Sequence, residues 1–450
     1  MLQLNNFLLI FNFVLRTKII KHIKDIDLIV SKLLEWSKSF DDVVFLDSNE
    51  GKDPDSSFEK VLAFDAITAL KTNSGNAFEQ LEAYQKTTKD WIFGYLAYDL
   101  KNETEDLSSN NTDNLEFPDL FFFQPKKIIF LEENQLIFSY LRMVDDEVEE
   151  DFLAIMNQLP KNGDYTEPVK IKTRISRNEY IDKVQQALAH IHRGDIYEMN
   201  FCQEFYIEDH TFDTINCFKA LNKKAKAPFT CYFKHENLFA IGSSPERFIK
   251  KEGRKILSQP IKGTAKRDED HQTDNYLKSQ LKSNPKEISE NIMIVDLVRN
   301  DLSKIARKGS VNVDELCGIY SFKQVHQMIS TISAQLKDDI SLSEIMEATF
   351  PMGSMTGAPK VSAMQIIENL ESTKRGLYSG CIGYISPEFD FDFNVVIRSI
   401  LHNSSQKYTS LMVGSAITQA AVPEAEYEEC LVKARALMEV LTSNAETRSI

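Results

Sequence analysis

Short apolar runs separated by polar turns fill the first third of the chain. Three of them, DDVVFLDS (41–48), WIFGYLAYDL (91–100) and LFFFQPKKIIFLEENQLIFSYLR (120–142), are rich in aromatic and β-branched residues. Runs of this kind, bounded by turn residues, are typical of strands in an antiparallel sheet. We therefore predict a β-rich N-terminal region, residues 1–165, with its boundary in PKNGDYTEP (160–168).

Helical and strand patterns mix beyond this point. SRNEYIDKVQQALAHIHRG (176–194) has the spacing of an amphipathic helix that ends at Gly194. SNPKEISENIMIVDLVRNDL (283–302) predicts a helix with Asn284 as N-cap and Pro285 in its first turn. Because residues 292–298 are apolar on nearly all sides, we predict that this helix is buried. The whole pattern predicts an α+β fold, with a larger body at 166–450.

Composition narrows the class of protein. The chain has 450 residues, 42% hydrophobic and 26% charged, with a net charge of −15, so no basic surplus is available for nucleic acid. Its six cysteines form no CxxC pair, which favours a reducing, cytoplasmic location. The apolar run from Phe7 to Leu15 lacks a basic flank and a cleavage site, and it is too short to span a membrane, so we expect no export.

Lys262 is unusual, because it stands between an apolar run and Gly263 in ILSQPIKGTAKRDED (256–270). Glu246, in IGSSPERF (241–248), precedes Lys262 in the sequence by a number of residues that suits the two ends of a hairpin. On the surface the two would form a weak ion pair. In a pocket they would be an acid and a nucleophile with shifted pKa values.

Two predicted helices begin with pairs of glutamates three residues apart. Glu287 and Glu290 open one helix, and Glu426 and Glu429 follow Pro423 in AVPEAEYEECLVKARALMEVL (421–441). First-turn glutamates often only complement the helix dipole. Two pairs facing each other would instead supply the oxygen ligands that Mg²⁺ prefers.

Glycine-rich and cationic features suggest a small anionic substrate. FPMGSMTGAPKVSAMQIIENLE (350–371) is a polar turn before a helix, where amides and hydroxyls could hold a carboxylate, although it does not match a P-loop. FNVVIRSIL (393–401) predicts an apolar strand that carries Arg398, either structural or bound to a carboxylate. Gly414 is predicted at a strand end in LMVGSAITQAA (411–421). No GxGxxG, HExxH or GxSxG motif occurs.

Six ordered motifs now resemble those of the chorismate-utilising enzymes: SSPERF, QPIKGTAKR, ENIMIVDLVRNDL, FPMGSMTGAPK, YSGCIGY and EAEYEE. Their order and spacing are similar to those of the synthase components that add ammonia to chorismate. The resemblance covers residues 175–445 well and the N-terminal part loosely. It implies a large four-layer αββα sandwich, with a chorismate-binding catalytic domain at 166–450.

The PIxGT motif separates two reactions within this family. Anthranilate synthases usually carry alanine at x, whereas 4-amino-4-deoxychorismate synthases, which serve p-aminobenzoate and folate synthesis, carry lysine. PIKGT thus implies that Lys262 attacks C2 of chorismate while the C4 hydroxyl leaves, and that ammonia then enters at C4. Glu246 would be the general acid and then the base. Because the attacking amine must be neutral, we expect burial and nearby cationic charge to lower the pKa of Lys262.

The resemblance also implies a binding set. Glu290 and Glu429 would be Mg²⁺ ligands, with Glu287 and Glu426 as companions, and Mg²⁺ would hold the ring carboxylate. The remaining substrate-binding residues would be Arg398, Gly414, Thr264, Ser354, Tyr378 and Gln327. No glutaminase motif is visible, so ammonia would come from a partner glutamine amidotransferase subunit.

Three positions depart from the family pattern. Glu198 replaces a usual glutamine, Gln327 stands where anthranilate synthases usually have histidine, and Ala416 replaces a glycine. Two alternatives stay open on these grounds. One is anthranilate synthesis, which Lys262 and Gln327 disfavour. The other is a catalytically weak chorismate-binding subunit, which the departures at Glu198 and Ala416 would explain.

Overall fold

The computed structural model describes residues 15–49, 58–159, 169–323 and 325–442. The predicted boundary at 160–168 and the N-terminal apolar run, apart from Leu15, lie outside the described residues. Among the described residues, no helix is both long and apolar enough to cross a membrane.

The strands form two antiparallel layers. The first layer is ordered β1 (Arg16–His22), β6 (Gln135–Leu141), β5 (Leu120–Glu132), β3 (Lys60–Thr72), β2 (Asp42–Asp47), β9 (Phe229–His235), β10 (Leu238–Ser244), β19 (Ser399–Asn403), β20 (Tyr408–Thr418) and β8 (Glu198–Ile207). The short strands β7 (Lys172–Thr173) and β16 (Gly357–Ala358) pair with β8.

The second layer branches from the first at β5, whose first residues pair with β4 (Ile92–Leu96). From β4 it continues through β17 (Cys381–Ile385), β18 (Phe391–Asn394), β11 (Arg247–Glu252), β12 (Lys255–Gln259) and β15 (Val325–Gln335). Two further strands, β13 (Ile261–Lys266) and β14 (Asn312–Ser321), pair with β15. All described strands therefore belong to one hydrogen-bonded network.

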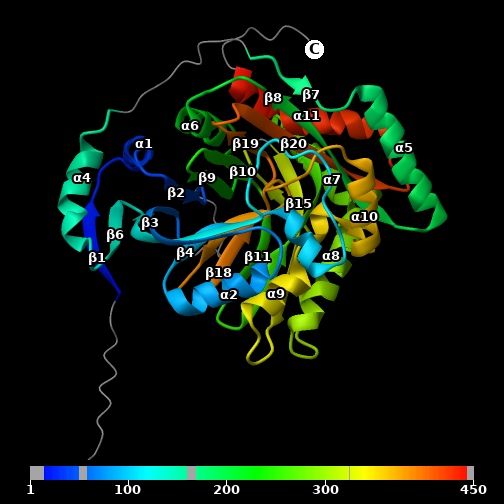
Figure 1. Cartoon of the computed structure of the whole chain (residues 1–450). Coiled ribbons are helices and arrows are strands. Elements are labelled where there is room, and N and C mark those ends of the chain that lie inside the picture. Colours follow the sequence, from blue (N-terminus) through cyan, green and yellow to red (C-terminus); the bar gives the residue numbers. More distant parts are fainter. Residues whose placement is uncertain (1–14, 50–57, 160–168, 324, 443–450) are drawn as a thin grey trace, which may run out of the picture.

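Helices cover the outer face of each layer (Figure 1). The second layer is covered by α2 (Ala77–Thr88), α7 (His271–Ser283), α8 (Pro285–Ile305) and α9 (Leu342–Thr349). The first is covered by α1 (Ile26–Ser37), α4 (Val148–Met156), α5 (Arg177–Arg193), α6 (Thr214–Ala225), α10 (Lys360–Leu370) and α11 (Pro423–Thr442). Short helical turns are α3 (Lys101–Thr104), η1 (Tyr98–Leu100), η2 (Asp145–Glu147) and η3 (Gly353–Met355). This arrangement confirms the predicted four-layer αββα sandwich.

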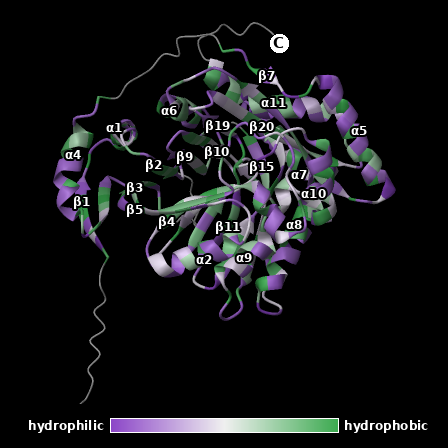
Figure 2. Ribbon diagram, in the orientation of Figure 1, coloured by the Kyte–Doolittle hydropathy of each residue, from purple (hydrophilic) through white to green (hydrophobic). Residues whose placement is uncertain are grey.

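The apolar runs follow from this layering. In β2, Val44 packs in one hydrophobic cluster between the layers, while Val43 and Phe45 pack in the other, beneath the helices. Successive side chains of a strand point to opposite faces, so a strand covered on both faces is apolar throughout. Figure 2 shows this contrast between the green strand β5 and the helices, which alternate between purple and green.

The predicted helix boundaries are confirmed, but the predicted burial of α8 is wrong. The Asn284 side chain accepts hydrogen bonds from the amides of Lys286 (3.0 Å) and Glu287 (3.4 Å). However, Ile292 is 41% exposed and Asp296 is also exposed. The helix is amphipathic, because its contacts with the sheet use one face and the apolar run is longer than that face requires.

Strand pairing crosses the predicted division at residue 165. β2 pairs with β9, and β4 pairs with β17. Both hydrophobic clusters also draw residues from either side. The division into regions 1–165 and 166–450 stays a prediction.

Candidate active site

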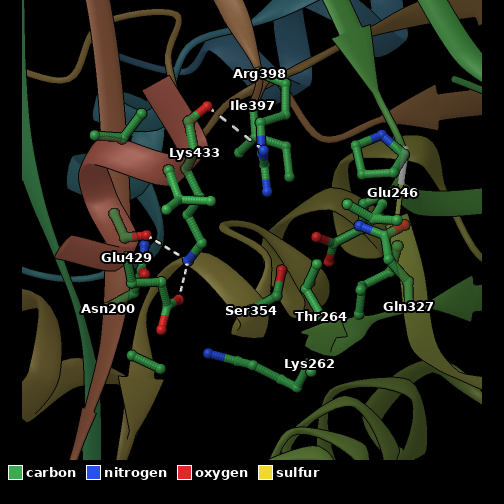
Figure 3. Close-up of a pocket in the computed structure, with 18 of the residues that line it drawn as sticks. Asn200, Glu246, Lys262, Thr264, Gln327, Ser354, Ile397, Arg398, Glu429 and Lys433 are labelled. Atoms are coloured by element: carbon green, nitrogen blue, oxygen red, sulfur yellow. Dashed lines mark hydrogen bonds and ion pairs between the residues drawn. The ribbon is translucent and has the colours of Figure 1, made fainter. Parts of the chain in front are cut away.

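Residues from both layers line one cavity of about 490 Å³ (Figure 3). Strand β13 contributes Lys262 to it, and α8 and α11 contribute their glutamates. All twelve residues selected from the sequence lie on its walls: Glu246, Lys262, Thr264, Glu287, Glu290, Gln327, Ser354, Tyr378, Arg398, Gly414, Glu426 and Glu429. The structure thus brings the set together, while the role of each member stays a prediction.

Lys262 projects from β13 into this cavity. Its Nζ donates a hydrogen bond to Oε1 of Glu198 at 2.6 Å, and both side chains are buried. The next residue, Gly263, has a φ of +97°, and a Cβ there would lie 3.1 Å from Oε2 of Glu287. Glycine is therefore needed both for the left-handed backbone and for the close approach of α8.

The charges around Lys262 are the reverse of those predicted. Burial pulls its pKa down, but the carboxylates of Glu198, Glu290 and Glu246 outweigh burial and raise the pKa above its usual value. The predicted lowering by cationic neighbours is therefore wrong. Lys262 rests as an ammonium held by Glu198, because opposite charges stabilise its charged form.

Glu246 lies between β10 and β11, on the wall that Figure 3 shows beside Gln327. Its backbone carbonyl accepts a hydrogen bond from the amide of Val395 (3.0 Å). Burial raises the pKa of its carboxyl to about 7. A carboxyl with this pKa can both donate and accept a proton near neutral pH, as a general acid that later acts as a base must.

Arg398 lies outside any strand, so the predicted apolar strand through it is wrong. The chain leaves β18 at Asn394 and enters β19 at Ser399, passing from one layer to the other. Arg398 has a φ of +53°, and its carbonyl accepts from the amide of Ser243 (3.1 Å). This crossing interrupts the strand and points the guanidinium into the cavity (Figure 3).

The Arg398 guanidinium is available to an anion. In the described part of the chain it donates to the carbonyl of Lys433 (3.5 Å) and forms no ion pair with a carboxylate. Burial lowers its pKa, which nonetheless begins from a very high value. A partly buried arginine whose guanidinium pairs with no carboxylate of the described residues would bind a substrate carboxylate in a two-bond geometry.

Gly414 lies inside β20 and not at a strand end as predicted. Its carbonyl accepts a hydrogen bond from Nζ of Lys433 (2.8 Å). A Cβ at this position would lie 2.7 Å from Sγ of Cys202 and 2.9 Å from the Asn200 side chain. Any side chain here would therefore disturb the layer beneath the cavity.

The four glutamates of α8 and α11 lie along one cavity wall and are partly neutralised by lysines. Lys286 Nζ is 3.1 Å from Glu426 and 3.8 Å from Glu290, so two carboxylates from different helices converge on one cation. Glu429 pairs with Lys433 at 2.6 Å. Burial, together with the charges of Glu198 and Glu287, raises the pKa of Glu290 to about 7.

These carboxylates match Mg²⁺ in donor chemistry, and Lys286 marks a point where two of them already share a positive charge. As they stand, no three acidic, histidine or cysteine side chains within the described ranges are close enough to hold a metal ion. A cation at this wall would thus replace the lysine as the counter-charge.

The polar wall opposite comes from β13, β15, η3 and the segment before β17. Thr264 and Gln327 are cross-strand neighbours, and Oε1 of buried Gln327 has no hydrogen-bond partner among the described residues. Ser354 is buried in η3. Burial raises the pKa of Tyr378 well above its usual value, so its hydroxyl stays protonated. These groups leave donors and an acceptor for a polar ligand.

Several residues in or beside the cavity escaped the sequence analysis. Lys286 and Lys433 lie four residues from Glu290 and Glu429, a helical spacing that signals ion pairs. Glu198 was noted as a departure from the family pattern, but its contact with Lys262 depends on the pairing of β8 with β16 and β20 and has no local signal. Asn200, two residues further along β8, also lines the cavity.

Known proteins similar to this chain include a family and several curated relatives. Residues 41–439 match the family of chorismate binding enzymes. The probable aminodeoxychorismate synthase, chloroplastic, of Oryza sativa subsp. japonica is 35% identical over 387 residues, covering 77% of this chain and 43% of the relative. Aminodeoxychorismate synthase component 1 of Salmonella typhimurium is 33% identical over 348 residues, covering 77% of this chain and 76% of the relative.

The fold of this chain is also found in a solved structure. Anthranilate synthase component I from Streptococcus pneumoniae shares the fold with a TM-score of 0.74, at 22% identity over 84% of this chain and 91% of its own. The chain spans less than half the length of the rice relative and about three quarters of the Salmonella one. Because the family match covers most of its length and bacterial relatives match over most of theirs, this chain belongs to the family of chorismate binding enzymes.

Proposed function

We propose that this chain converts chorismate and ammonia to 4-amino-4-deoxychorismate. The observation that carries the proposal is the buried amine of Lys262, which points into the same cavity as the guanidinium of Arg398 (Figure 3). An amine in this place offers a nucleophile to a bound dianion. The cavity volume of about 490 Å³ lies within the range of small-molecule sites.

Binding would use two neighbouring parts of the cavity. Arg398 and the backbone near Gly414 would hold one carboxylate of chorismate, and the wall of α8 and α11 would hold the other through Mg²⁺. Mg²⁺ bound there would neutralise the substrate carboxylate and fix its orientation. The residues proposed to bind it are Glu290 and Glu429, with Glu287 and Glu426 beside them.

The first half-reaction would displace the C4 hydroxyl. The neutral amine of Lys262 forms a bond to C2, the ring double bonds shift, and the C4–O bond breaks. Glu246 donates its proton to the departing hydroxyl, which leaves as water. The pKa of Glu246, raised to about 7 by burial, supports this role because part of the population carries the proton at neutral pH.

The second half-reaction would reverse the displacement with a different nucleophile. Ammonia adds at C4, the double bonds shift back, and the bond from C2 to Lys262 breaks. We propose that a glutamine amidotransferase subunit supplies this ammonia in the cell, consistent with the designation "component 1" of the Salmonella relative.

All six cysteines are free thiols, which supports a reducing location such as the cytoplasm.

The test is a product assay on the purified chain with chorismate, Mg²⁺ and ammonium at mildly alkaline pH, resolved by liquid chromatography and mass. We expect 4-amino-4-deoxychorismate, which an added lyase converts to p-aminobenzoate. Anthranilate as the product would show that Lys262 does not decide the reaction. No turnover, with chorismate binding retained, would favour a chorismate-binding subunit.

A further inference from the structure

Glu198 forms the closest contact to the amine of Lys262. The 2.6 Å hydrogen bond joins a carboxylate that is 1% exposed to an amine whose residue is 8% exposed. We propose that Glu198 is the base that takes the proton from Lys262 and so produces the nucleophile. This assigns a catalytic role to one of the three residues that depart from the family pattern. This role of Glu198 rests on the proposed function.

The other carboxylates are less suited to this step. Glu290 and Glu246 both influence the charge of Lys262, but within the described residues neither forms an ion pair with it. Glu246 must keep its own proton for the leaving hydroxyl. Glu287 and Glu429 are also influenced by the charge of Lys262, but within the described residues neither forms an ion pair with it, and Glu429 is paired with Lys433. Glu198 remains as the direct acceptor.

The position of Glu198 is fixed by the sheet. It begins β8, where its backbone pairs with Thr418 of β20 on one side and Ala358 of β16 on the other. Its second oxygen, Oε2, is buried without a hydrogen-bond partner among the described residues. Once protonated, the carboxyl can donate back to the neutral amine, so the same hydrogen bond persists with its direction reversed.

The protons balance over the cycle. The Lys262 ammonium gives one proton to Glu198, leaving a neutral amine and a neutral carboxylic acid. The amine then bonds to C2 as a secondary ammonium, while Glu246 protonates the departing hydroxide. When neutral ammonia adds at C4 and the bond from C2 to Lys262 breaks, Lys262 leaves as a neutral amine. The new ammonium at C4 gives a proton to the Glu246 carboxylate, which acts here as the base. Glu198 returns its proton to Lys262, and product release closes the cycle.

The variant Glu198→Gln separates this role from a purely electrostatic one, because the two predict opposite signs. The charge of Glu198 helps to raise the pKa of Lys262, so its loss leaves more neutral amine at a given pH. An electrostatic role alone predicts adduct formation at the wild-type rate or faster. A base predicts a slower rate, by about 10²-fold at pH 7 to 8, partly regained at higher pH as hydroxide takes the proton.

The experiment is rapid-quench mass spectrometry of the Lys262 adduct with chorismate and Mg²⁺, without ammonia, from pH 6.5 to 10. Glu198→Asp, which keeps a carboxylate one methylene further back, should regain part of the rate. Glu208→Gln is the matched control, since Glu208 pairs with Lys172 on the surface just beyond β8. A rate in Glu198→Gln equal to or above the wild type overturns the proposal.

A second measurement needs no chorismate. The pH dependence of Lys262 labelling by an amine-reactive reagent, read by mass spectrometry, should shift to lower pH in Glu198→Gln. An unchanged midpoint would show that the two groups are not coupled and would overturn the proposal. Failure of the proposed function looks different: the wild-type chain itself would form no adduct and no 4-amino-4-deoxychorismate.

Discussion

The amine of Lys262 enters the cavity from β13, and its removal should leave the binding groups in place (Figure 3). In Lys262→Ala we expect no covalent adduct and a fall in turnover of about 10³-fold or more, because the nucleophile is gone. Chorismate should still bind, as measured by calorimetry. Lys255→Ala, at an exposed position of β12, should behave as the wild type. Wild-type turnover in Lys262→Ala would contradict the nucleophile assignment.

Glu246 should also affect stability in a pH-dependent way. Its pKa in the folded protein, about 7, lies above its usual value of 4.5, so ionisation opposes folding and stability is lost as pH rises through this window. Glu246→Gln removes this contribution. We expect its free energy of unfolding to fall less between pH 5 and pH 8 than that of the wild type, by about 1–3 kcal/mol.

Urea denaturation at several pH values measures this difference. Glu252→Gln, at the exposed end of β11, is the control for loss of one carboxylate. The same Glu246→Gln protein should form the adduct about 10²- to 10⁴-fold more slowly, since a general acid is missing. Parallel pH curves for the wild type and Glu246→Gln would show that Glu246 is not shifted.

Single residues were well predicted where a local motif marked them. They were poorly predicted where a contact between distant segments sets their environment. The sequence placed Lys262 and Glu246 in one site. It misjudged the charge around Lys262, because Glu198 lies 64 positions away in the chain and meets it through sheet pairing. No periodicity or composition argument reports such a contact.

At the scale of elements, α8 presents Glu287 from its first turn and Glu290 from the turn that follows. Asn284 caps this turn by accepting from two backbone amides. In Asn284→Ala we expect a loss of about 1 kcal/mol in the free energy of unfolding, measured in urea. Because Lys286, Glu287 and Glu290 depend on this turn, the Mg²⁺ concentration for half-maximal activity should also rise. Ser283→Ala, one residue earlier, should change neither.

The proposed metal wall joins α8 to α11. In Glu290→Gln and Glu429→Gln we expect activity and Mg²⁺ dependence to fall together, since each loses one carboxylate ligand. Titration of Mn²⁺ followed by paramagnetic resonance gives a readout independent of turnover. Glu428→Gln, exposed on α11, is the control. Wild-type kinetics at micromolar Mg²⁺ in either variant would place the cation elsewhere.

Elements were predicted best where capping signals were strong. Asn284 and Pro423 mark helix starts, and Gly194 marks a helix end, that the structure confirms. The failure at FNVVIRSIL has a physical reason. The stretch is as apolar as a strand because it is buried between the layers, yet it must cross from β18 to β19 and cannot stay extended.

At the scale of the molecule, the shared sheet makes the predicted division at residue 165 testable. Residues 166–450 expressed alone would lack the strands that pair with β9 and β17. We expect this fragment to show no cooperative thermal transition, because two strand edges and part of both hydrophobic clusters would be exposed. Co-expression with residues 1–165 should restore it. A fragment that unfolds cooperatively alone would support independent domains.

The fold class could be predicted through the resemblance, but the strand order could not. Local patterns report that β2 and β4 are strands, and β2 is apolar on both faces. They do not report that β2 pairs with β9 or that β4 pairs with β17, since pairing depends on contacts between distant segments.

The pairing of β4 with β17 also has a consequence for synthesis on the ribosome. About 290 residues separate the two strands, which corresponds to ~15–60 s of translation at ordinary elongation rates. During this interval the edge of β4 that pairs with β17 has no native partner. The edge of β2 that pairs with β9 likewise has none until β9 is synthesised. We therefore expect the nascent N-terminal strands to be the segment that chaperones hold until the C-terminal half emerges.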